Sequence, residues 1–335
     1  AKRRGLGFGL WVEPEMANVK SELAEAHPDW ILREEKRPLA VGRGGTQVVL
    51  DYTNPAGRRG VWEMLDGVFG ESAPLAYVKW DSNQNIVNPG SAYLAADRQP
   101  NLWYDYTIGL YDVLAKCRAR RPDTLIQACA SGGGHVDFGI LRYCDEFWTS
   151  DCTDPLCRVF IQWGTSMFYP ANAMAAHVTA SPNHQTGRRT PLKYRFDVAM
   201  TGRMGFELHP KDLSADELAF AKRAVADYKR IRPIVQQGDL YRLASPYEND
   251  FAALMYVNGD RSRAVVFVLG LDRAKPVSVS IPLMGLDAAD RYEVREINCG
   301  VSRHSANVDA GRMSISLNWP FDSAVFQMDR HGYDR

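Results

Sequence analysis

The sequence has no excess of charge of either sign and no long apolar run. Its 335 residues include 40 Lys and Arg against 40 Asp and Glu. A chain without net charge has no general electrostatic attraction to nucleic acid or to an anionic membrane surface, so we expect neither as a partner. No apolar run reaches the roughly eighteen residues that a membrane-spanning helix needs.

Cysteines are few and follow no metal-binding pattern. The six are Cys117, Cys129, Cys144, Cys152, Cys157 and Cys299. None forms a Cys-x-x-Cys pair, and no Cys and His residues have zinc spacing. The apolar stretch after residue 5 is too short for a signal peptide, and no cleavage-site pattern follows it. We therefore expect reduced thiols, no metal site and a cytoplasmic location.

The common phosphate-binding motifs are also missing. Three glycines, Gly132 to Gly134, follow Cys129-Ala130-Ser131, but neither Gly-x-Gly-x-x-Gly nor Gly-Lys-Ser/Thr is present. Glycines after a strand let the backbone approach a ligand closely, or they form a tight turn. A nucleophilic role for Cys129 is a weak alternative, because no histidine stands out as its base.

Strand-like and helix-like segments alternate along the first 240 residues. The expected strands are 6–14, 46–51, 77–81, 124–129, 146–151, 174–181 and 197–208, and the expected helices are 18–26, 55–69, 102–120, 155–168 and 213–231. This alternation predicts an α/β fold with a mostly parallel sheet. Polar residues at successive strand ends favour a (β/α)8 TIM-type barrel over a doubly wound sheet.

The pattern of expected elements changes after about residue 241, from alternating strands and helices to strands alone. Short strands are expected at 251–257, 263–269, 277–281, 291–297, 314–317 and 324–328. The dipeptide Asn258-Gly259 is a strong hairpin signal between the first two. We expect a barrel domain over 1–240 and a small antiparallel β-sandwich over 241–335.

One strand, Ala76–Asp81, delivers charged and aromatic side chains to its end. Lys79 and Asp81 are two residues apart, so on a strand they point to the same face and can share a pocket. A lysine there would hold the carboxylate ionised, as a carboxylate nucleophile requires. The alternative interpretation is a surface strand end with an ordinary ion pair.

A second aspartate, Asp151, lies at the end of a later strand that contains Trp148. Two strand-end carboxylates are what glycoside hydrolysis needs, because one attacks the anomeric carbon and the other protonates the departing oxygen. The alternative is that Asp151 or Asp154 caps the helix expected from Pro155, and Asp154 is the better candidate for the cap.

Several motifs, in order from about Leu6 to Leu208, resemble glycoside hydrolase family 36, the bacterial α-galactosidase family. They are Trp11–Met16, Tyr77–Asp81, Cys129–Gly134, Trp148–Asp154, His177-Val178 and Pro182–Arg188. The resemblance implies a retaining α-glycosidase on a (β/α)8 barrel followed by a β-sandwich. It implies no metal and no organic cofactor.

The resemblance also implies roles for individual residues. Asp81 matches the nucleophile and Asp151 the acid/base. Sugar-binding roles fall to Trp11, Arg43, Lys79, Trp80, Asn83, Cys129, Gly132 and Gly133, with Trp11 or Trp80 offering an aromatic face and the Cys129 loop lying near the 2-position. His135 stands where the family has arginine, and no role is assigned to it. His184 is expected to be a structural loop residue.

The expected function is hydrolysis of terminal α-linked galactose from raffinose-type oligosaccharides through a galactosyl-enzyme intermediate. An α-N-acetylgalactosaminidase stays open, because the Cys129–Gly134 loop decides the room around the 2-substituent. Transglycosylation and homo-oligomerisation stay open too.

The strand at residues 6–13 resembles the third strand of the family's barrel. Six of eight strands are therefore expected here, with an open sheet edge at 6–13. We expect a truncated piece that lacks the family's N-terminal sandwich and the Asp-Asp pair that binds the 4- and 6-hydroxyls. A carbohydrate-binding protein without turnover is accordingly a further alternative.

Overall fold

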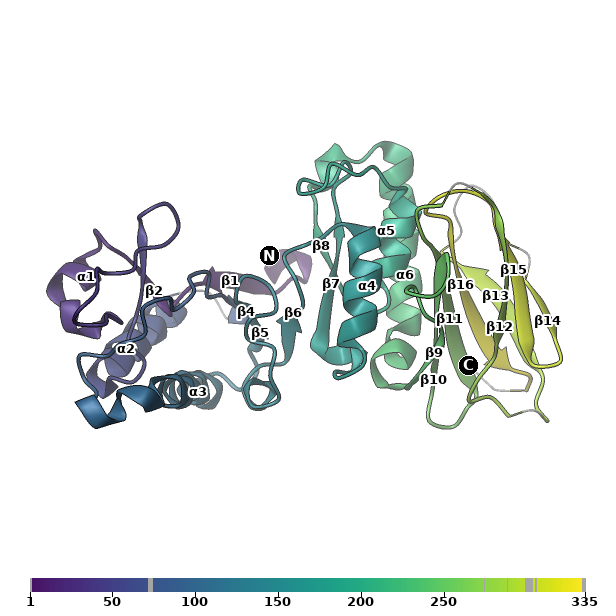
Figure 1. Cartoon of the computed structure of the whole chain (residues 1–335). Helices are drawn as coiled ribbons and strands as arrows, with labels where there is room; N and C mark the ends of the chain where they lie inside the picture. Colours follow the sequence, from purple (N-terminus) through teal and green to yellow (C-terminus); the bar gives the residue numbers. More distant parts are fainter. Residues whose placement is uncertain are drawn as a thin grey trace. The chain divides into compact units, whose positions relative to one another are not determined.

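The computed structural model describes residues 2–71, 75–273, 275–287, 289–298, 304 and 306–332. Cys299, expected to be a reduced thiol, lies outside these ranges, and the other five cysteines are free. The chain forms two compact units, residues 1–148 and 149–335, and each is described by itself (Figure 1). In the described ranges no helix is both long and apolar enough to cross a membrane.

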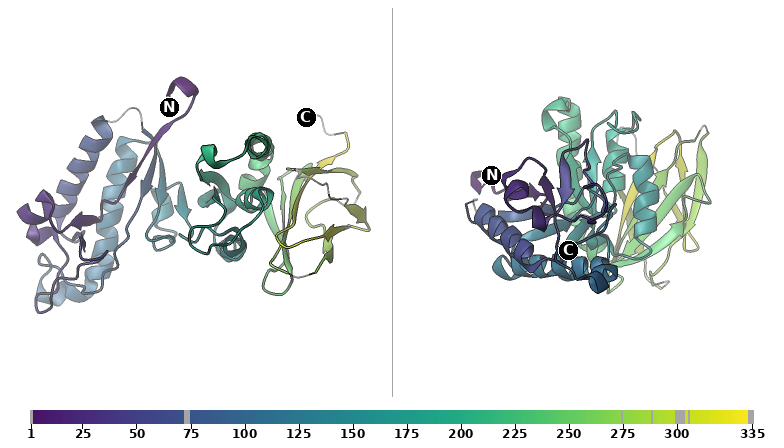
Figure 2. Two further views of the ribbon diagram at one scale, coloured as in Figure 1. Left: turned by 90° about the horizontal axis from the view of Figure 1, so that it is seen from above. Right: turned by 60° about the vertical axis from the view of Figure 1, so that its left-hand side comes forward.

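The first unit is built on four parallel strands and two long helices. The strands pair in the order β1 (Phe8–Val12), β4 (Leu75–Trp80), β5 (Leu125–Ala128) and β6 (Glu146–Trp148). The helices α2 (Pro55–Glu71) and α3 (Leu102–Arg120) lie side by side (Figure 2). Buried residues of α3 recur every three or four positions, the spacing of a helix with one apolar face.

A small antiparallel ribbon follows β1 and departs from the expected pattern. The predicted helix over 18–26 is instead β2 (Met16–Asn18) followed by α1 (Glu22–Ala26), because the side chain of Ser21 caps the helix by accepting a hydrogen bond from Ala24 N. The strand expected at 46–51 is β3 (Gln47–Val49), which pairs with β2 and does not join the parallel sheet.

Short 3-10 turns complete the first unit. They are η1 (Lys2–Arg4), η2 (Pro28–Trp30), η3 (Ala96–Asn101) and η4 (Ile140–Arg142). In the described part of the chain β1 pairs with β4 alone, so β1 is an edge strand, as the sequence predicts. Phe8 and Trp11 on this strand are largely exposed.

The second unit begins with α/β elements. The strands β7 (Met174–Thr179) and β8 (Arg203–Glu207) are parallel, and they are accompanied by α4 (Pro155–Thr165), α5 (Leu192–Ala199) and α6 (Ala215–Gln237) and by the turns η5 (Ala171–Ala173) and η6 (Pro210–Asp212). The strand predicted from residue 197 is wrong at its start, because 197–199 end α5. A capping box of Ser214 and Glu217 begins α6, which runs beyond the predicted residue 231 because Ile234 and Val235 are buried.

Two antiparallel sheets make up the rest of the second unit, as the sequence predicts. One has the order β13 (Tyr292–Ile297), β16 (Ser323–Arg330), β11 (Arg263–Gly270), β10 (Phe251–Val257) and β9 (Asp239–Ala244), and the other β12 (Val277–Pro282), β15 (Arg312–Leu317) and β14 (Asn307–Asp309). The sequence missed β9 and β14. The predicted domain boundary near residue 240 stays a prediction.

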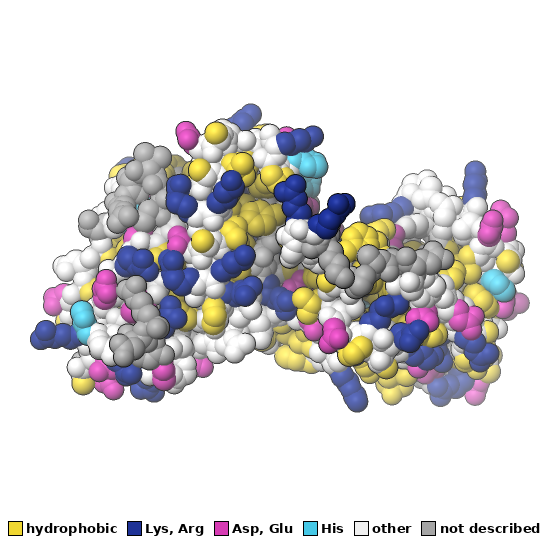
Figure 3. Space-filling model, turned by 180° about the vertical axis from the view of Figure 1, so that it is seen from behind, with side chains coloured by type: hydrophobic (Ala, Val, Ile, Leu, Met, Phe, Trp, Pro, Cys, Tyr) yellow, Lys and Arg dark blue, Asp and Glu magenta, His cyan; other side chains and the backbone are white. Residues whose placement is uncertain are grey.

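Both faces of β10 and β11 are buried, which suits their apolar residues 251–257 and 264–269. One face, with Val266 and Val268, packs with Ile315 of the smaller sheet. The other face, with Val265 and Phe267, packs with buried residues of α5 and α6. Charges of both signs are scattered over the face of the molecule in Figure 3, in keeping with the zero net charge.

An ion pair within α5 is tied to the sandwich of this unit by hydrogen bonds. Asp197 is fully buried, and its carboxylate accepts hydrogen bonds from Lys193 Nζ at 2.6 Å, from Ser323 Oγ at 2.7 Å and from Asn298 Nδ2. Burial raises the pKa of Asp197, and these donors oppose the rise.

We predict that Asp197→Ala lowers the free energy of unfolding by about 3–5 kcal/mol, because it leaves the Lys193 ammonium buried without its carboxylate. Urea unfolding followed by circular dichroism measures the change. The control is Asp212→Ala, at an exposed position in η6, with an expected change within about 0.5 kcal/mol. Equal midpoints for the two variants would contradict the role given to Asp197.

Candidate active site

Asp81 directly follows β4 and is held by neutral hydrogen-bond donors. Its Oδ2 accepts from Trp11 Nε1 at 3.0 Å, and its Oδ1 accepts from the backbone N–H of Ser82 at 2.9 Å. Burial would raise the pKa of Asp81, but hydrogen bonds from Asn83, Cys129, Trp11 and Ser82 outweigh it and lower the pKa below its ordinary value. The side chain is therefore an oriented, ionised carboxylate at a strand end.

Lys79 contacts an aromatic ring near Asp81. Its Nζ lies over the ring of Trp148, 5.2 Å from the ring centre, a cation–π distance. The sequence predicted that Lys79 keeps Asp81 ionised, whereas the hydrogen bonds that lower the pKa of Asp81 come from uncharged groups. Lys79 nevertheless lies near enough to Cys129 to act on the pKa of that thiol, so it shares the surroundings of Asp81.

Asn83 reaches Asp81 because Glu13 holds it in place. Glu13 Oε1 accepts from Asn83 Nδ2 at 2.7 Å and from Asn83 N at 3.1 Å. Glu13 Oε2 accepts from Gln47 Nε2 at 2.6 Å, which ties the β2–β3 ribbon to the same carboxylate. Sequence reasoning did not assign Glu13. Glu13 could have been assigned from the sequence because it comes two residues after Trp11. In an extended segment that spacing puts both side chains on the same side.

The loop after β5 lies against Asp81. Cys129 N donates to Trp80 O at 2.7 Å, which keeps the loop in register with β4. Ser131 and Gly132 follow with φ of 45° and 92°, and a Cβ on Gly134 would lie 2.7 Å from Ala130 O. The tight turn therefore requires glycine at Gly134 and favours it at Gly132.

Cys129 in this loop is a neutral thiol. Burial and its hydrogen bond to Asp81 raise its pKa to about 12. A thiol with so high a pKa donates to Asp81 and is a poor nucleophile. The weak alternative of a cysteine nucleophile is thus disfavoured. Gly133, also assigned to the sugar site, forms a bridge with Ala130 in the same turn.

Trp80 and Arg43, both assigned to the sugar site, differ in how their surroundings fit that role. Trp80 is 1% exposed, so the prediction that it offers an aromatic face to a sugar is wrong. Side chains alternate along β4, and Trp80 points away from the face that carries Lys79. Arg43 lies exposed on the β2–β3 loop with φ of 46°, and it is not among the residues shown to hydrogen-bond Asp81 in the described chain. Trp11, by contrast, is 53% exposed.

A buried carboxylate behind Trp80 was missed by sequence reasoning. Glu15 accepts from Trp80 Nε1 at 3.0 Å and from the hydroxyl of Tyr106 at 2.8 Å, and it pairs with His135 Nε2 at 2.8 Å. His135, to which no role was assigned, thus has a carboxylate partner. Glu15 lies two residues after Glu13 in the same motif, but its partners are far away in sequence.

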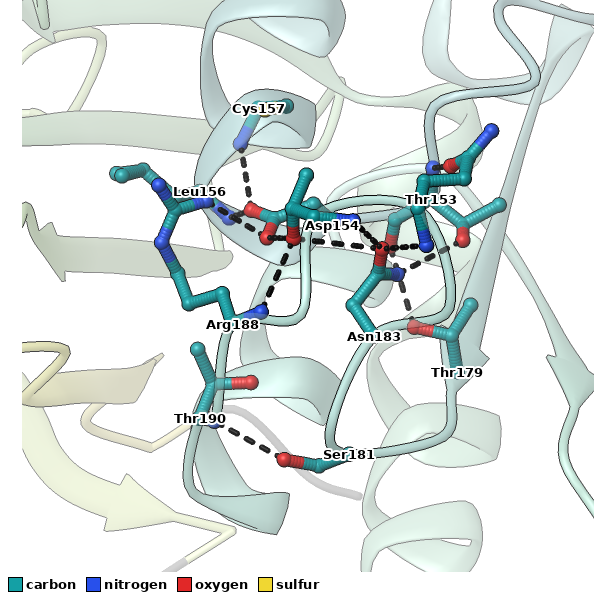
Figure 4. A network of polar contacts seen from close by, with 11 residues as sticks. Thr153, Asp154, Leu156, Cys157, Thr179, Ser181, Asn183, Arg188 and Thr190 are labelled. Carbon is teal, nitrogen blue, oxygen red and sulfur yellow. Dashed lines mark hydrogen bonds and ion pairs between the residues drawn. The ribbon is translucent and has the colours of Figure 1, made fainter.

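Asp151 belongs to the second unit and lies exposed in the turn before α4. The neighbouring Asp154 is the N-cap of α4, where its Oδ1 accepts from the backbone N–H groups of Leu156 at 2.9 Å and Cys157 at 3.2 Å (Figure 4). The cap is therefore Asp154, as the sequence favoured. Asp151 is therefore not the residue that caps α4.

The end of β7 and the 181–190 loop hold the turn that precedes α4 in place. Thr153 O accepts from Thr179 Oγ1 at 3.1 Å, and Thr153 Oγ1 accepts from Asn183 Nδ2 at 3.0 Å (Figure 4). Arg188 pairs with Asp154 at 2.6 Å. Burial would raise the pKa of Asp154, but hydrogen bonds from Thr186, Cys157 N and Arg188 lower it. His184, exposed in this loop, was expected to be structural, and that stays a prediction.

The described residues contain no group of three or more His, Cys, Asp or Glu side chains arranged to hold a metal ion. The chemistry that the arrangement offers is that of oriented carboxylates beside aromatic and amide groups.

We predict that Asp154→Ala lowers the free energy of unfolding by about 1–3 kcal/mol, because it removes the cap and leaves Arg188 unpaired. Asp154→Asn keeps a capping oxygen without the charge, so its loss should be smaller. Since the pKa of Asp154 is lowered by folding, its contribution is present above the ordinary carboxyl pKa and disappears as pH falls through the lowered value. Denaturant unfolding between pH 2 and 7 measures this, and equal losses in both variants would contradict it.

Comparison with known proteins matches these features to one family. The family model described as Melibiase matches residues 1–238. α-Galactosidase AgaA of Geobacillus stearothermophilus is 45% identical over 292 residues, which are 87% of this chain and 40% of that protein. α-Galactosidase 1 of Pediococcus pentosaceus is 37% identical over 291 residues, 87% of this chain and 39% of that protein. The chain thus spans about 40% of the length of these curated relatives.

Solved structures agree in fold. The GH36 α-galactosidase AgaA A355E D548N in complex with raffinose superposes with a TM-score of 0.88 at 39% identity, over 98% of this chain and 45% of that one. The α-galactosidase from Lactobacillus brevis has a TM-score of 0.89 at 33% identity, over 100% of this chain and 46% of that one. The parallel strands with their helices and the sandwich that follows them are therefore a fold that this chain shares with these structures. The chain belongs to the Melibiase family, in its glycoside hydrolase family 36 branch.

Proposed function

We propose that this chain carries the two catalytic carboxylates of a retaining α-galactosidase. The observation that supports this most is the state of Asp81: an ionised carboxylate at the end of a parallel strand, fixed by Trp11 and by the backbone N–H of Ser82. A nucleophilic carboxylate needs this combination of charge and orientation.

In the proposed mechanism Asp81 attacks the anomeric carbon of the sugar. Asp151, in its protonated form, donates a proton to the departing glycosidic oxygen as the bond to the leaving sugar breaks. Asp151, now a carboxylate, then removes a proton from a water molecule, which hydrolyses the ester between Asp81 and the sugar. The anchoring of the turn that carries Asp151, through Thr153 and Asp154, supports a fixed position for this acid/base.

The sugar-binding roles follow the surroundings of Asp81. Trp11 is exposed enough to offer its ring to the apolar face of a pyranose while its Nε1 holds Asp81. We assign Lys79 and Asn83 as donors to sugar hydroxyls and the Cys129 loop, with Gly132 and Gly133, to the region of the 2-substituent. Arg43 is proposed as a loop donor that approaches when substrate is bound.

The proposed substrates are oligosaccharides that end in α-linked galactose. Structures of the relative AgaA contain raffinose and stachyose, which supports this class. A cytoplasmic location and a homo-oligomer stay predictions. An α-N-acetylgalactosaminidase, a transglycosylase and a binding protein without turnover are separated from the proposal by the experiment below.

We predict that Asp81→Asn and Asp151→Asn each lower the turnover of p-nitrophenyl α-galactoside by at least about 10³-fold, because each removes a group that acts on the reacting atoms. Asp123→Asn, at an exposed position before β5, is the control and should keep the wild-type rate. A normal rate for Asp81→Asn would exclude Asp81 as the nucleophile. If the wild type binds galactose without turnover, the binding protein is favoured. Faster turnover of the N-acetyl analogue would favour the α-N-acetylgalactosaminidase. Oligosaccharide products would favour transglycosylation.

We also predict that Trp11→Phe lowers kcat by about tenfold and moves the acidic limb of the kcat/KM profile to higher pH. The variant keeps an aromatic ring but loses the indole donor that lowers the pKa of Asp81. Steady-state rates between pH 3 and 8 measure both effects. A rise in KM with an unmoved acidic limb would mean that Trp11 contributes stacking alone.

A further inference from the structure

The buried carboxylate of Glu15 collects partners from three separate parts of the first unit. Trp80 comes from β4, Tyr106 from α3 and His135 from the segment after the glycine turn, and all three contact the carboxylate at 2.8–3.0 Å. We refer to Glu15, Trp80, Tyr106 and His135 as the Glu15 network. The backbone of Glu15 is fixed as well, because its carbonyl accepts from Leu50 N at 2.9 Å.

The charges in the network depend on each other. Burial alone would raise the pKa of Glu15, but the charge and hydrogen bond of His135 and the donors Trp80 and Tyr106 outweigh burial and lower it. Burial would lower the pKa of His135, but the pair with Glu15 outweighs burial and raises it. Both shifts favour an imidazolium–carboxylate pair near neutral pH.

This pair is linked to Asp81 along two short paths. Trp80, whose indole is held by Glu15, is the residue before Asp81, and Asp81 N donates to Val12 O at 2.9 Å. His135 is the residue after Gly134, so it anchors the end of the turn that begins at Cys129. Cys129 donates to the Asp81 carboxylate, and its backbone N–H donates to Trp80 O at 2.7 Å. The Glu15 network thus fixes both the backbone at Asp81 and the loop beside it.

Resting on the proposed function of Asp81, we propose that His135 and Glu15 form a positioning pair whose charged state keeps Asp81 oriented for attack. While His135 is charged, the pair holds the Trp80 indole and the Cys129–Gly134 turn in the geometry that orients Asp81. Deprotonation removes the positive charge that offsets the buried Glu15, and the single hydrogen bond at Nε2 then persists only in the tautomer that keeps its proton on that nitrogen.

The other titratable groups around the pair either raise the pKa of His135 or stay neutral. Asp137, in the loop that follows His135, and Asp81, at the end of β4, both raise the pKa of His135. Tyr106 on α3 donates to Glu15, and the pKa of Tyr52, before α2, is raised by burial and by Glu15. These tyrosines therefore stay neutral across the pH range in which His135 loses its proton.

Two further titratable groups, Asp51 and Cys117, lie near the tyrosines. Asp51 raises the pKa of Tyr106, and Cys117 raises the pKa of Tyr52. The pKa of Cys117 is itself raised to about 12 by burial, so this thiol does not titrate together with His135. The alkaline transition near the network is accordingly assigned to the imidazolium.

The direction of the pH effect follows from the sign of the shift. Folding raises the pKa of His135, so the pair's contribution is complete below the ordinary histidine value and is lost as pH rises through the raised value. Folding lowers the pKa of Glu15, so the acidic loss lies below the ordinary glutamate value. The pair's contribution to kcat is therefore lost on the alkaline side of the raised value, apart from the requirement for a protonated Asp151.

The test uses two substitutions with opposite expectations. His135→Arg keeps a cation beside Glu15 at all pH values, so its kcat at pH 7 should stay near that of the wild type. His135→Gln imitates the uncharged state, so kcat at pH 7 should fall about tenfold with little change in KM. His209→Arg, at an exposed position, is the control and should keep the wild-type profile. Thermal melting verifies that each variant is folded.

A second readout does not depend on turnover. The indole N–H resonance of Trp80, identified by its loss in Trp80→Phe, should move with pH in the wild type and become insensitive over the same range in His135→Arg. Failure of the wild type to cleave p-nitrophenyl α-galactoside overturns the proposed function, and the resonance then decides on the coupling between His135 and Trp80. A kcat as low in folded His135→Arg as in His135→Gln, or a Trp80 resonance that does not change with the substitution, overturns the positioning pair.

Discussion

The parallel pairing of β1 with β4 is the interaction on which the rest of the site depends. The register sets Trp11 opposite Lys79 and Val12 opposite Trp80. Because β1 and β4 run in the same direction, the residues that leave β1 arrive beside those that leave β4. Trp11 thereby meets Asp81 and Glu13 meets Asn83, each 70 residues further along the chain. These two contacts between distant parts of the chain follow from a single strand register, whereas Glu15 turns back to Trp80.

The three carboxylates around the ends of β1 and β4 are stabilised in different ways. Asp81 accepts from uncharged donors, which keep it ionised without neutralising its charge. Glu13 accepts from amides and acts as a tether between loops. Glu15 is the most deeply buried and is paired with a histidine. A carboxylate that must form a bond needs its charge left available, whereas a carboxylate that supports its neighbours is better neutralised by a partner.

Much of this arrangement could be predicted because it is local. An apolar run that ends in charge marked the end of β4, and Asp154 before Pro155 marked the start of α4. The burial of Trp80 could have been predicted from the same alternation that placed Lys79 and Asp81 on one face. The pair of Glu15 with His135 could not, because 120 residues separate them and no local pattern specifies the contact. The short strand β14 and the ribbon strand β2 were missed because three residues carry too little periodicity.

The position of Trp11 on β1 has a consequence for how the site withstands stress. Trp11 travels with β1, so any separation of β1 from β4 withdraws the indole from Asp81. Local openings of this kind cost less free energy than global unfolding. They would loosen the carboxylate of Asp81 while the sheets of the sandwich keep their own hydrogen bonds.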